Sequence, residues 1–173
     1  GVTIRPEQGD VVLDCGACWG DSTMLFADLV GFTSISEQLG SERTVALANT
    51  ALSAMSSAIV EHDGYVNKFL GDGLMAFWSA FEPQPDQARL ACDAAIACRA
   101  ALEAVNVDSD VQLGLRLGIA TGEAIVGDCG APPDLNDYTA IGNTVNLAAR
   151  LESANKQLGT TILVDAATRS QAG

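Results

Sequence analysis

The hydrophobic and polar positions of the chain predict a β-sheet built from short strands. Residues 111–119 alternate between apolar and other side chains, which is typical of a strand with one buried face. A turn at Thr121-Gly122 and a returning strand over residues 123–127 would form a hairpin, followed by a loop over residues 128–136. Short apolar runs predict further strands at residues 23–28, 65–70, 74–78, 138–141 and 161–164.

Four other segments have the periodicity of helices. In the first, Ser34 and Glu37 have the spacing of a capping box, and Gly40 would end the helix. Asp86 is a suitable N-cap for the third helix. The predicted helices cover residues 34–40, 42–61, 86–105 and 143–153, and the second has an apolar stripe of Val45, Ala48, Leu52, Met55 and Ile59, which we expect to be core.

Two aspartates interrupt this apolar pattern at the ends of strands. Asp28 follows the apolar run at residues 24–27, and Asp72 lies in the Gly71-Asp72-Gly73 turn between two predicted strands, where Asp-Gly favours a hairpin. A carboxylate beside buried strand residues is costly unless a partner compensates its charge, and a bound cation is a common partner. Two such carboxylates together indicate a site for one or two Mg²⁺ ions of the kind used in phosphoryl chemistry.

Composition sets the class of protein. A length of 173 residues and 48% hydrophobic content favour one globular domain, and a net charge of −13 argues against binding of nucleic acid through a basic surface. No apolar run is long enough to span a bilayer and no leader peptide opens the chain, so we expect a cytoplasmic protein. The five cysteines are interpreted as reduced thiols, and the single histidine, His62, excludes His-based zinc sites.

Residues 1–22 fit this organisation least. A predicted strand at residues 11–14 leads into a Gly-rich loop at residues 15–21, which weakly resembles the nucleotide-binding loop of Rossmann-type methyltransferases. An ordinary turn is the favoured interpretation, because a short Gly-rich loop alone has low specificity. We therefore divide the chain into an N-terminal appendage, residues 1–22, and a main domain, residues 23–173. Binding of S-adenosylmethionine would distinguish a methyltransferase fragment.

Four ordered blocks resemble the catalytic domains of class III nucleotidyl cyclases. They are LFADLVGFTSIS at 25–36, VNKFLGDGLMAFW at 66–78, LGIATGEAIVGDCG at 117–130 and YTAIGNTVNLAARLES at 138–153. The resemblance implies an α+β fold, a ferredoxin-like sandwich whose mostly antiparallel sheet has helices largely on one face. It also implies that the chain lacks the usual final strands, which include a phosphate-binding lysine. The diguanylate cyclase signature is not reproduced at residues 71–73.

The resemblance assigns a metal and phosphate site. Asp28, Asp72 and the backbone carbonyl of Leu29 match the residues that bind two Mg²⁺ or Mn²⁺ ions. Exposed amides at the turn into the following helix can hold phosphate oxygens, and they belong to Gly31, Phe32 and Thr33.

The resemblance also assigns purine and transition-state contacts. Lys68, four residues before Asp72, matches the lysine of adenylyl cyclases, where guanylyl cyclases have glutamate. An ammonium can donate to N1 of adenine but has no use for the N1–H of guanine. Thr139 matches the second purine contact, in a subgroup that includes bicarbonate-responsive cyclases. Asn146 and Arg150, one helical turn apart, match the residues that orient the ribose and stabilise charge on the α-phosphate.

These assignments predict an adenylyl cyclase that converts ATP to 3′,5′-cyclic AMP and pyrophosphate. In the family, one domain supplies the aspartates and a second supplies the purine contacts and the Asn/Arg pair. Since this chain has both sets, we expect a head-to-tail homodimer and a nearly inactive monomer. The alternative is a catalytically silent module with the cyclase fold that binds nucleotide or mediates dimerisation.

Overall fold

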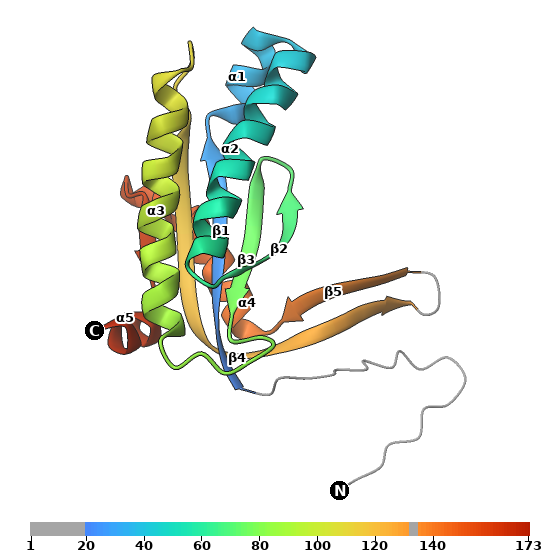
Figure 1. The fold of residues 1–173 in the computed structure, drawn as a ribbon, viewed down its shortest axis with the longest axis vertical. Helices are drawn as coiled ribbons and strands as arrows, with labels where there is room; N and C mark the ends of the chain where they lie inside the picture. The colour runs from blue at the N-terminus through green and yellow to red at the C-terminus, as the bar shows by residue number, and fades with distance from the viewer. Residues whose placement is uncertain (1–19, 132–134) are drawn as a thin grey trace, which may run out of the picture.

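The computed structural model describes residues 20–131 and 135–173, which form a sheet with helices packed on both of its faces (Figure 1). Residues 1–19 and 132–134 lie outside this description, and with them the strand predicted at residues 11–14 and most of the Gly-rich loop predicted at residues 15–21. The last two residues of that loop, Gly20 and Asp21, belong instead to the first strand of the sheet, which begins before the predicted boundary at residue 23. In chain order the elements are β1 (Gly20–Val30), α1 (Phe32–Leu39), α2 (Ser41–Glu61), β2 (Tyr65–Leu70), β3 (Gly73–Trp78), α3 (Gln87–Val107), β4 (Gly114–Ala131), β5 (Leu135–Ile141), α4 (Asn143–Leu158), β6 (Ile162–Val164) and α5 (Ala166–Ala172).

The strands form a mostly antiparallel sheet, as predicted. Their order is β2-β3-β1-β4-β5, each neighbouring pair is antiparallel, and β6 pairs with β4 in parallel. The hairpin predicted at Gly71-Asp72-Gly73 is confirmed between β2 and β3. The outer part of β4 and its partner β5 form a long hairpin that projects from the body of the domain (Figure 1).

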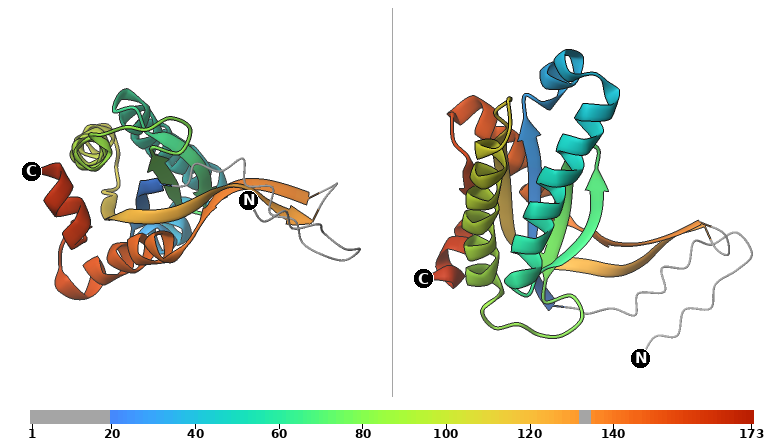
Figure 2. Two further views of the ribbon diagram at one scale, coloured as in Figure 1. Left: turned by 90° about the horizontal axis from the view of Figure 1, so that it is seen from below. Right: turned by 45° about the horizontal axis from the view of Figure 1, so that its top comes forward.

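Alternation along β1 sends successive side chains to opposite faces of the sheet. Leu25, Ala27 and Leu29 belong to the larger core, which α2 and α3 cover. Met24 and Phe26 belong to a second cluster, which includes Ala148 of α4. Figure 2 shows α4 on the opposite side of the sheet from α2 and α3.

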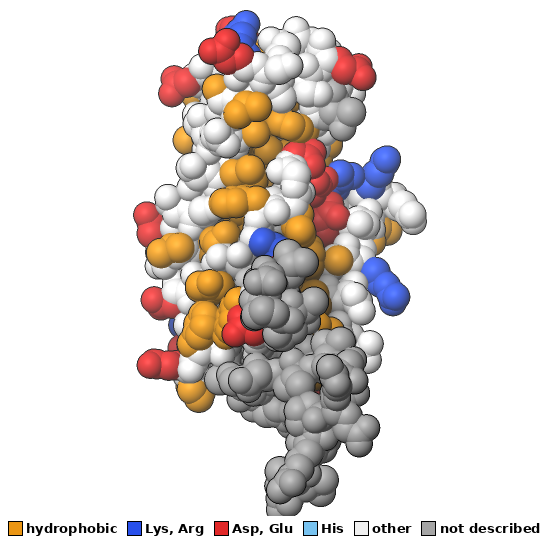
Figure 3. All heavy atoms as spheres, turned by 90° about the vertical axis from the view of Figure 1, so that its right-hand side faces the viewer, with side chains coloured by type: hydrophobic (Ala, Val, Ile, Leu, Met, Phe, Trp, Pro, Cys, Tyr) orange, Lys and Arg blue, Asp and Glu red, His pale blue; other side chains and the backbone are white. Residues whose placement is uncertain are grey.

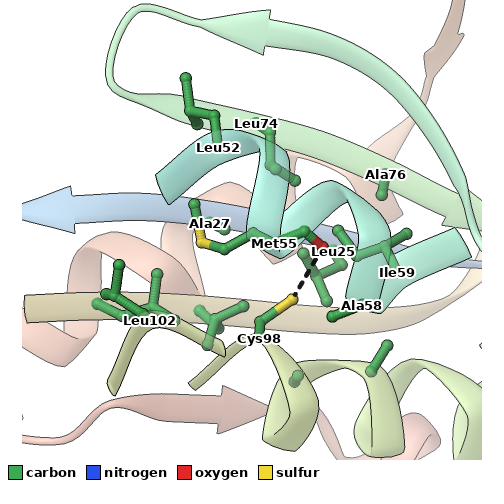
Figure 4. Packing of buried hydrophobic residues seen from close by; sticks show 14 of the residues in the cluster. Leu25, Ala27, Leu52, Met55, Ala58, Ile59, Leu74, Ala76, Cys98 and Leu102 are labelled. Atoms are coloured by element: carbon green, nitrogen blue, oxygen red, sulfur yellow. Dashed lines mark hydrogen bonds between the residues drawn. The ribbon is translucent and has the colours of Figure 1, made fainter. Parts of the chain in front are cut away.

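The larger core is closely packed (Figure 4). Met55 of α2 and Cys98 of α3 are both fully buried, and the Cys98 thiol donates to the Met55 backbone carbonyl across 3.5 Å. Burial raises the pKa of Cys98 to about 12, so this thiol stays protonated at neutral pH. Among the residues that the structure describes, Cys92 and Cys98 are free thiols, as the sequence predicted for them.

Two predictions about the first helices were wrong in detail. α1 begins at Phe32 with Gly31 as its N-cap, so Ser34 lies inside the helix and forms no capping box. Val45 is 58% exposed, although Leu52, Met55 and Ile59 of the same predicted stripe are buried. Thr44, in the same turn of α2, is buried instead, so Val45 lies outside the face of the helix that packs on the core.

The hairpin predicted at Thr121-Gly122 was also wrong. β4 continues through both residues without a turn, and most of the loop predicted over residues 128–136 belongs to β4 and β5. The Thr121 hydroxyl lies 2.9 Å from that of Thr23 on β1 and 2.8 Å from that of Thr168 on α5. These buried contacts keep this segment in the strand where the Thr-Gly sequence suggested a turn.

The C-terminal part extends beyond the predicted elements. α4 ends at Leu158 rather than near residue 153, and α5 was not predicted. Asp165 caps α5 by accepting from the Thr168 amide across 2.9 Å. None of the helices in the described ranges is long and apolar enough to cross a membrane.

Candidate active site

The two predicted metal ligands, Asp28 and Asp72, lie at the same end of the sheet. Asp28 is opposite Gly73 in the β1–β3 register, and the Leu29 amide donates to the Asp72 backbone carbonyl across 3.2 Å. A Cβ at Gly73 would lie 2.4 Å from the Ala27 carbonyl oxygen, so only glycine allows this close approach. Both aspartates are half-buried, which leaves their carboxylates accessible.

Arg116 is a member of this site that the sequence did not reveal. It lies directly opposite Asp28 in the β1–β4 register, and its Nη2 donates to Asp28 Oδ2 across 2.6 Å. The Arg116 and Asp28 side chains are 19% and 29% exposed, so solvent screens this ion pair only in part.

A glycine on β4 brings a third carboxylate to the site from α4. A Cβ at Gly118 would lie 2.2 Å from both the Ala148 carbonyl oxygen and the Glu152 amide nitrogen. The missing side chain therefore lets α4 rest on the strand, where Glu152 Oε1 lies 3.2 Å from Arg116 Nε. These two buried atoms form an ion pair but lack the alignment of a hydrogen bond.

Burial and charge act together on Glu152. Loss of solvent is the largest cause that raises the pKa of Glu152, and the negative charges of Asp28 and Asp72 raise it further. A hydrogen bond from Ser153 and the positive charge of Arg116 act in the opposite direction. Both aspartates are thus close enough to act electrostatically on Glu152.

The charges around Asp28 favour a divalent cation. The described contacts set three carboxylates, those of Asp28, Asp72 and Glu152, against the single guanidinium of Arg116. In residues 20–131 and 135–173, no three His, Cys, Asp or Glu side chains form a complete metal cage. Mg²⁺ typically takes one or two carboxylates and completes its shell with water and substrate phosphates, so the residues fit such an ion.

The N-terminus of α1 lies just after the Asp28 strand. Gly31 has φ = 80°, and no side chain caps the helix there. The first amides of a helix lack partners within it, and they can therefore hold phosphate oxygens. Phe32 packs against the larger core and anchors this turn, whereas the side chain of Thr33 lies outside the described residues.

A β-bulge determines the direction of Lys68. Val66 pairs with Ala76 and Lys68 with Met75, so Asn67 is an extra residue in β2. Regular pairing would send Lys68 to the face that α2 and α3 cover. The bulge sends it instead to the face of Met75, which is also the face of Asp28 and Arg116.

The bulge also joins β2 to β5, although these strands lie at opposite ends of the strand order. Lys68 forms an ion pair with Asp137. Asn67 Nδ2 donates to the Tyr138 carbonyl oxygen across 2.6 Å, and the Thr139 hydroxyl donates to Asn67 Oδ1 across 3.3 Å. The structure therefore brings together the two predicted purine contacts, Lys68 and Thr139.

The remaining predicted pair, Asn146 and Arg150, lies elsewhere. Each is two residues, or about 200° of helical rotation, from the fully buried Ala148, so both face away from the sheet. Both are exposed, and they share a shallow groove of about 550 Å³. The groove is lined by Asn146, Ala149, Arg150, Ser153, Ala154 and Gln157. Asp28 and Asp72 of the same chain lie at the sheet, on the opposite side of α4 from this groove.

The residues that sequence reasoning missed had one weak signal. Arg116 is a charged residue in the polar register of an otherwise apolar strand, and Gly118 follows it in the same register. Glu152 showed no signal, because its role depends on how closely α4 approaches β4.

The chain is similar to known proteins in both sequence and structure. Residues 18–170 match the family described as the adenylate and guanylate cyclase catalytic domain. Adenylate cyclase 1 of Rhizobium meliloti is 38% identical over 160 residues, which is 90% of this chain but 24% of that protein. The guanylyl cyclase Cya2 superimposes with a TM-score of 0.82 at 33% identity, over 91% of this chain and 80% of that one. The adenylyl cyclase CyaB from P. aeruginosa does so with a TM-score of 0.79 at 34% identity, over 87% and 79%.

Proposed function

Because this chain belongs to the adenylate and guanylate cyclase catalytic domain family, we propose that it is an adenylyl cyclase that converts ATP to 3′,5′-cyclic AMP and pyrophosphate. The observation that carries this choice of nucleotide is the bulge that turns Lys68 away from the face covered by α2 and α3 and places it near Thr139, the other proposed purine contact. The Lys68 ammonium can only donate hydrogen bonds, which suits the unprotonated N1 of adenine and not the N1–H of guanine. The adenylate cyclase name of the Rhizobium meliloti relative supports the same choice.

Asp28, Asp72 and the Leu29 carbonyl would hold the two divalent ions, Mg²⁺ or Mn²⁺. When bound, these ions supply positive charge that holds the phosphates and lowers the pKa of the attacking hydroxyl. The Arg116 guanidinium has further N–H groups beyond the one that Asp28 accepts, and these can donate to a triphosphate. The first amides of α1, at Gly31, Phe32 and Thr33, offer further donors to the phosphate oxygens.

The chemistry is an internal displacement at the α-phosphorus. The ribose 3′-oxygen loses its proton and forms a bond to the α-phosphorus, while the bond from that phosphorus to the bridging β-phosphate oxygen breaks. Pyrophosphate leaves with the electron pair, and the proton passes to solvent. Arg150 stabilises the negative charge on the α-phosphate in the transition state, and Asn146 orients the ribose.

A head-to-tail homodimer supplies both halves of the site. Asn146 and Arg150 face away from the sheet on which Asp28 lies, so a second copy is needed to bring the two sets together. β2 is an edge strand whose Phe69 and Leu70 are 57% and 46% exposed. The face of the molecule shown in Figure 3 carries hydrophobic side chains along its length, with acidic and basic side chains beside them. Such a face suits burial against a second copy.

Production of cyclic AMP from ATP with Mg²⁺ or Mn²⁺ tests this proposal. We expect activity that rises more than linearly with protein concentration, far lower activity with GTP, and none in Asp72→Ala. Asn106→Ala is a matched control, because Asn106 holds only the Leu113 backbone, through two 2.8 Å hydrogen bonds. ATP binding without turnover by the folded wild-type protein would instead establish a silent cyclase-fold module.

A further inference from the structure

The bulge residue Asn67 carries no assigned role, yet it contacts the strand that holds Thr139. Its amide is half-buried and bridges β2 and β5 through two hydrogen bonds. The direction of this amide is settled by its partners. The Tyr138 carbonyl oxygen, 2.6 Å away, can only accept, so the Asn67 atom that faces it must be the Nδ2 donor.

The direction of the amide fixes that of the Thr139 hydroxyl. With Nδ2 turned to Tyr138, Oδ1 faces Thr139 and can only accept, so the Thr139 proton points toward Asn67. A threonine hydroxyl can ordinarily rotate and present either a proton or lone pairs to a ligand. Here the proton is already used, and the oxygen presents lone pairs.

We propose that Asn67 is a positioning residue that makes Thr139 a hydrogen-bond acceptor and so selects adenine over guanine. This inference rests on the proposed purine contacts of the cyclase site. The 6-position of adenine bears an amino donor, whereas that of guanine bears a carbonyl acceptor. A Thr139 oxygen that accepts can form a hydrogen bond with the amino group of adenine but is repelled by the carbonyl oxygen of guanine.

Lys68 contacts the neighbouring ring nitrogen, N1, as a hydrogen-bond donor, whereas Thr139 acts as an acceptor. Its ammonium, held by Asp137 through one N–H, keeps further N–H groups free to donate. A purine that accepts at N1 and donates at the 6-position satisfies both residues, and adenine has this pattern. The bulge therefore has two effects. It turns Lys68 toward the proposed purine site, and it places Asn67 where its amide orients the Thr139 hydroxyl.

The test is the ratio of kcat/KM for ATP to kcat/KM for GTP. In Asn67→Ala the Thr139 hydroxyl is free to rotate and donate to guanine, so we expect the ratio to fall about tenfold, mainly through better use of GTP. Thr139→Val should lower the ratio similarly, and the double variant should lower it no further than either single one. Thr139→Ser keeps the hydroxyl and should keep most of the discrimination.

Asn106→Ala again serves as the control, since Asn106 also bridges two backbone groups but lies at the end of α3. It should lower stability without changing the ratio. If Asn67→Ala does not fold, Asn67→Leu, which has nearly the same shape but neither hydrogen bond, replaces it in the test.

A second measurement needs no turnover. Calorimetry with the α,β-methylene analogues of ATP and GTP gives the two dissociation constants, and their ratio measures the preference for adenine in binding. A wild-type protein that prefers the ATP analogue but forms no product would end the proposed cyclase activity and leave the Asn67 proposal standing. An active ATP cyclase whose ratio is unchanged in Asn67→Ala, or is additive in the double variant, would overturn the Asn67 proposal alone. A wild-type preference for the GTP analogue would overturn both.

Discussion

Arg116 lies directly across the β-ladder from Asp28 and donates to its carboxylate across 2.6 Å. The same guanidinium lies 3.2 Å from Glu152, which reaches the sheet from α4. One cation therefore compensates two partly buried carboxylates, and one of these is a proposed metal ligand. A divalent ion at Asp28 would compete with Arg116 for that carboxylate.

Arg116→Ala should make the site more receptive to metal and the fold less stable. Removal of the guanidinium leaves Asp28 and Glu152 without their partner, at a cost of about 1–3 kcal/mol in the free energy of unfolding. Mn²⁺ should then raise Tm more in the variant than in the wild-type protein, which thermal unfolding with and without Mn²⁺ measures.

Arg43→Ala is the matched control for Arg116→Ala. The ion pair of Arg43 with Asp110 has side chains that are 67% and 89% exposed, so its loss should change stability by less than about 0.5 kcal/mol. Equal shifts of Tm by Mn²⁺ in wild-type protein and Arg116→Ala would show that the guanidinium does not compete for Asp28.

Gly118→Ala should separate α4 from the sheet. The new Cβ would lie 2.2 Å from the Ala148 carbonyl oxygen and the Glu152 amide nitrogen, both of which are backbone atoms that cannot rotate away. We expect a loss of about 3 kcal/mol, measured by urea denaturation, with lower activity because Glu152 moves from Arg116. In Gly122→Ala the nearest atom is the Thr144 side-chain hydroxyl at 3.0 Å, so a smaller loss is expected. Equal losses would argue against a special contact at Gly118.

Asp165 should make the stability of the C-terminal part depend on pH. Burial alone would raise the pKa of Asp165, but hydrogen bonds from Thr168, Thr121 and the Ala167 amide outweigh it, and the pKa lies below its ordinary value. The charged form therefore stabilises the fold at neutral pH. This contribution is lost as pH falls below the ordinary pKa of about 3.9 and through the lower folded value.

Asp165→Ala tests this dependence. The variant should be about 1 kcal/mol less stable than the wild-type protein at pH 7, as expected for loss of a helix cap. The difference should shrink in acid, because the wild-type carboxyl then becomes protonated. Chemical denaturation from pH 7 to pH 3 measures it, and a difference that stays constant over this range would contradict the assigned role of the carboxylate.

The sequence predicted most of the elements, because their signals are local. Asp-Gly at residues 72–73 identified the β2–β3 hairpin, and the alternation after Leu113 identified β4. Prediction from the sequence failed where contacts between distant residues override the local preference for a turn. Thr121-Gly122 has the composition of a turn, but hydrogen bonds to Thr23 and Thr168 hold it in a strand.

For the candidate site, the sequence indicated single residues but not the contacts that join them. The structure brings Asp28 near Asp72 and Lys68 near Thr139, as residues with assigned roles. The residues that link them, Arg116 and Asn67, depend on strand register and on a bulge. Neither contact is visible in a linear sequence, because Arg116 lies 88 residues from its partner Asp28, and Asn67 lies 72 residues from its partner Thr139.

The most direct test of the proposed catalytic arrangement mixes two inactive variants, Asp72→Ala and Arg150→Ala. In a head-to-tail dimer the mixed species has one site with intact Asp28 and Asp72 from one copy and intact Asn146 and Arg150 from the other. Random mixing at equal concentrations should restore about a quarter of the wild-type cyclic AMP production, since half of the dimers are mixed and each has one intact site of two. A mixture no more active than the two variants measured separately would contradict a site shared between two copies.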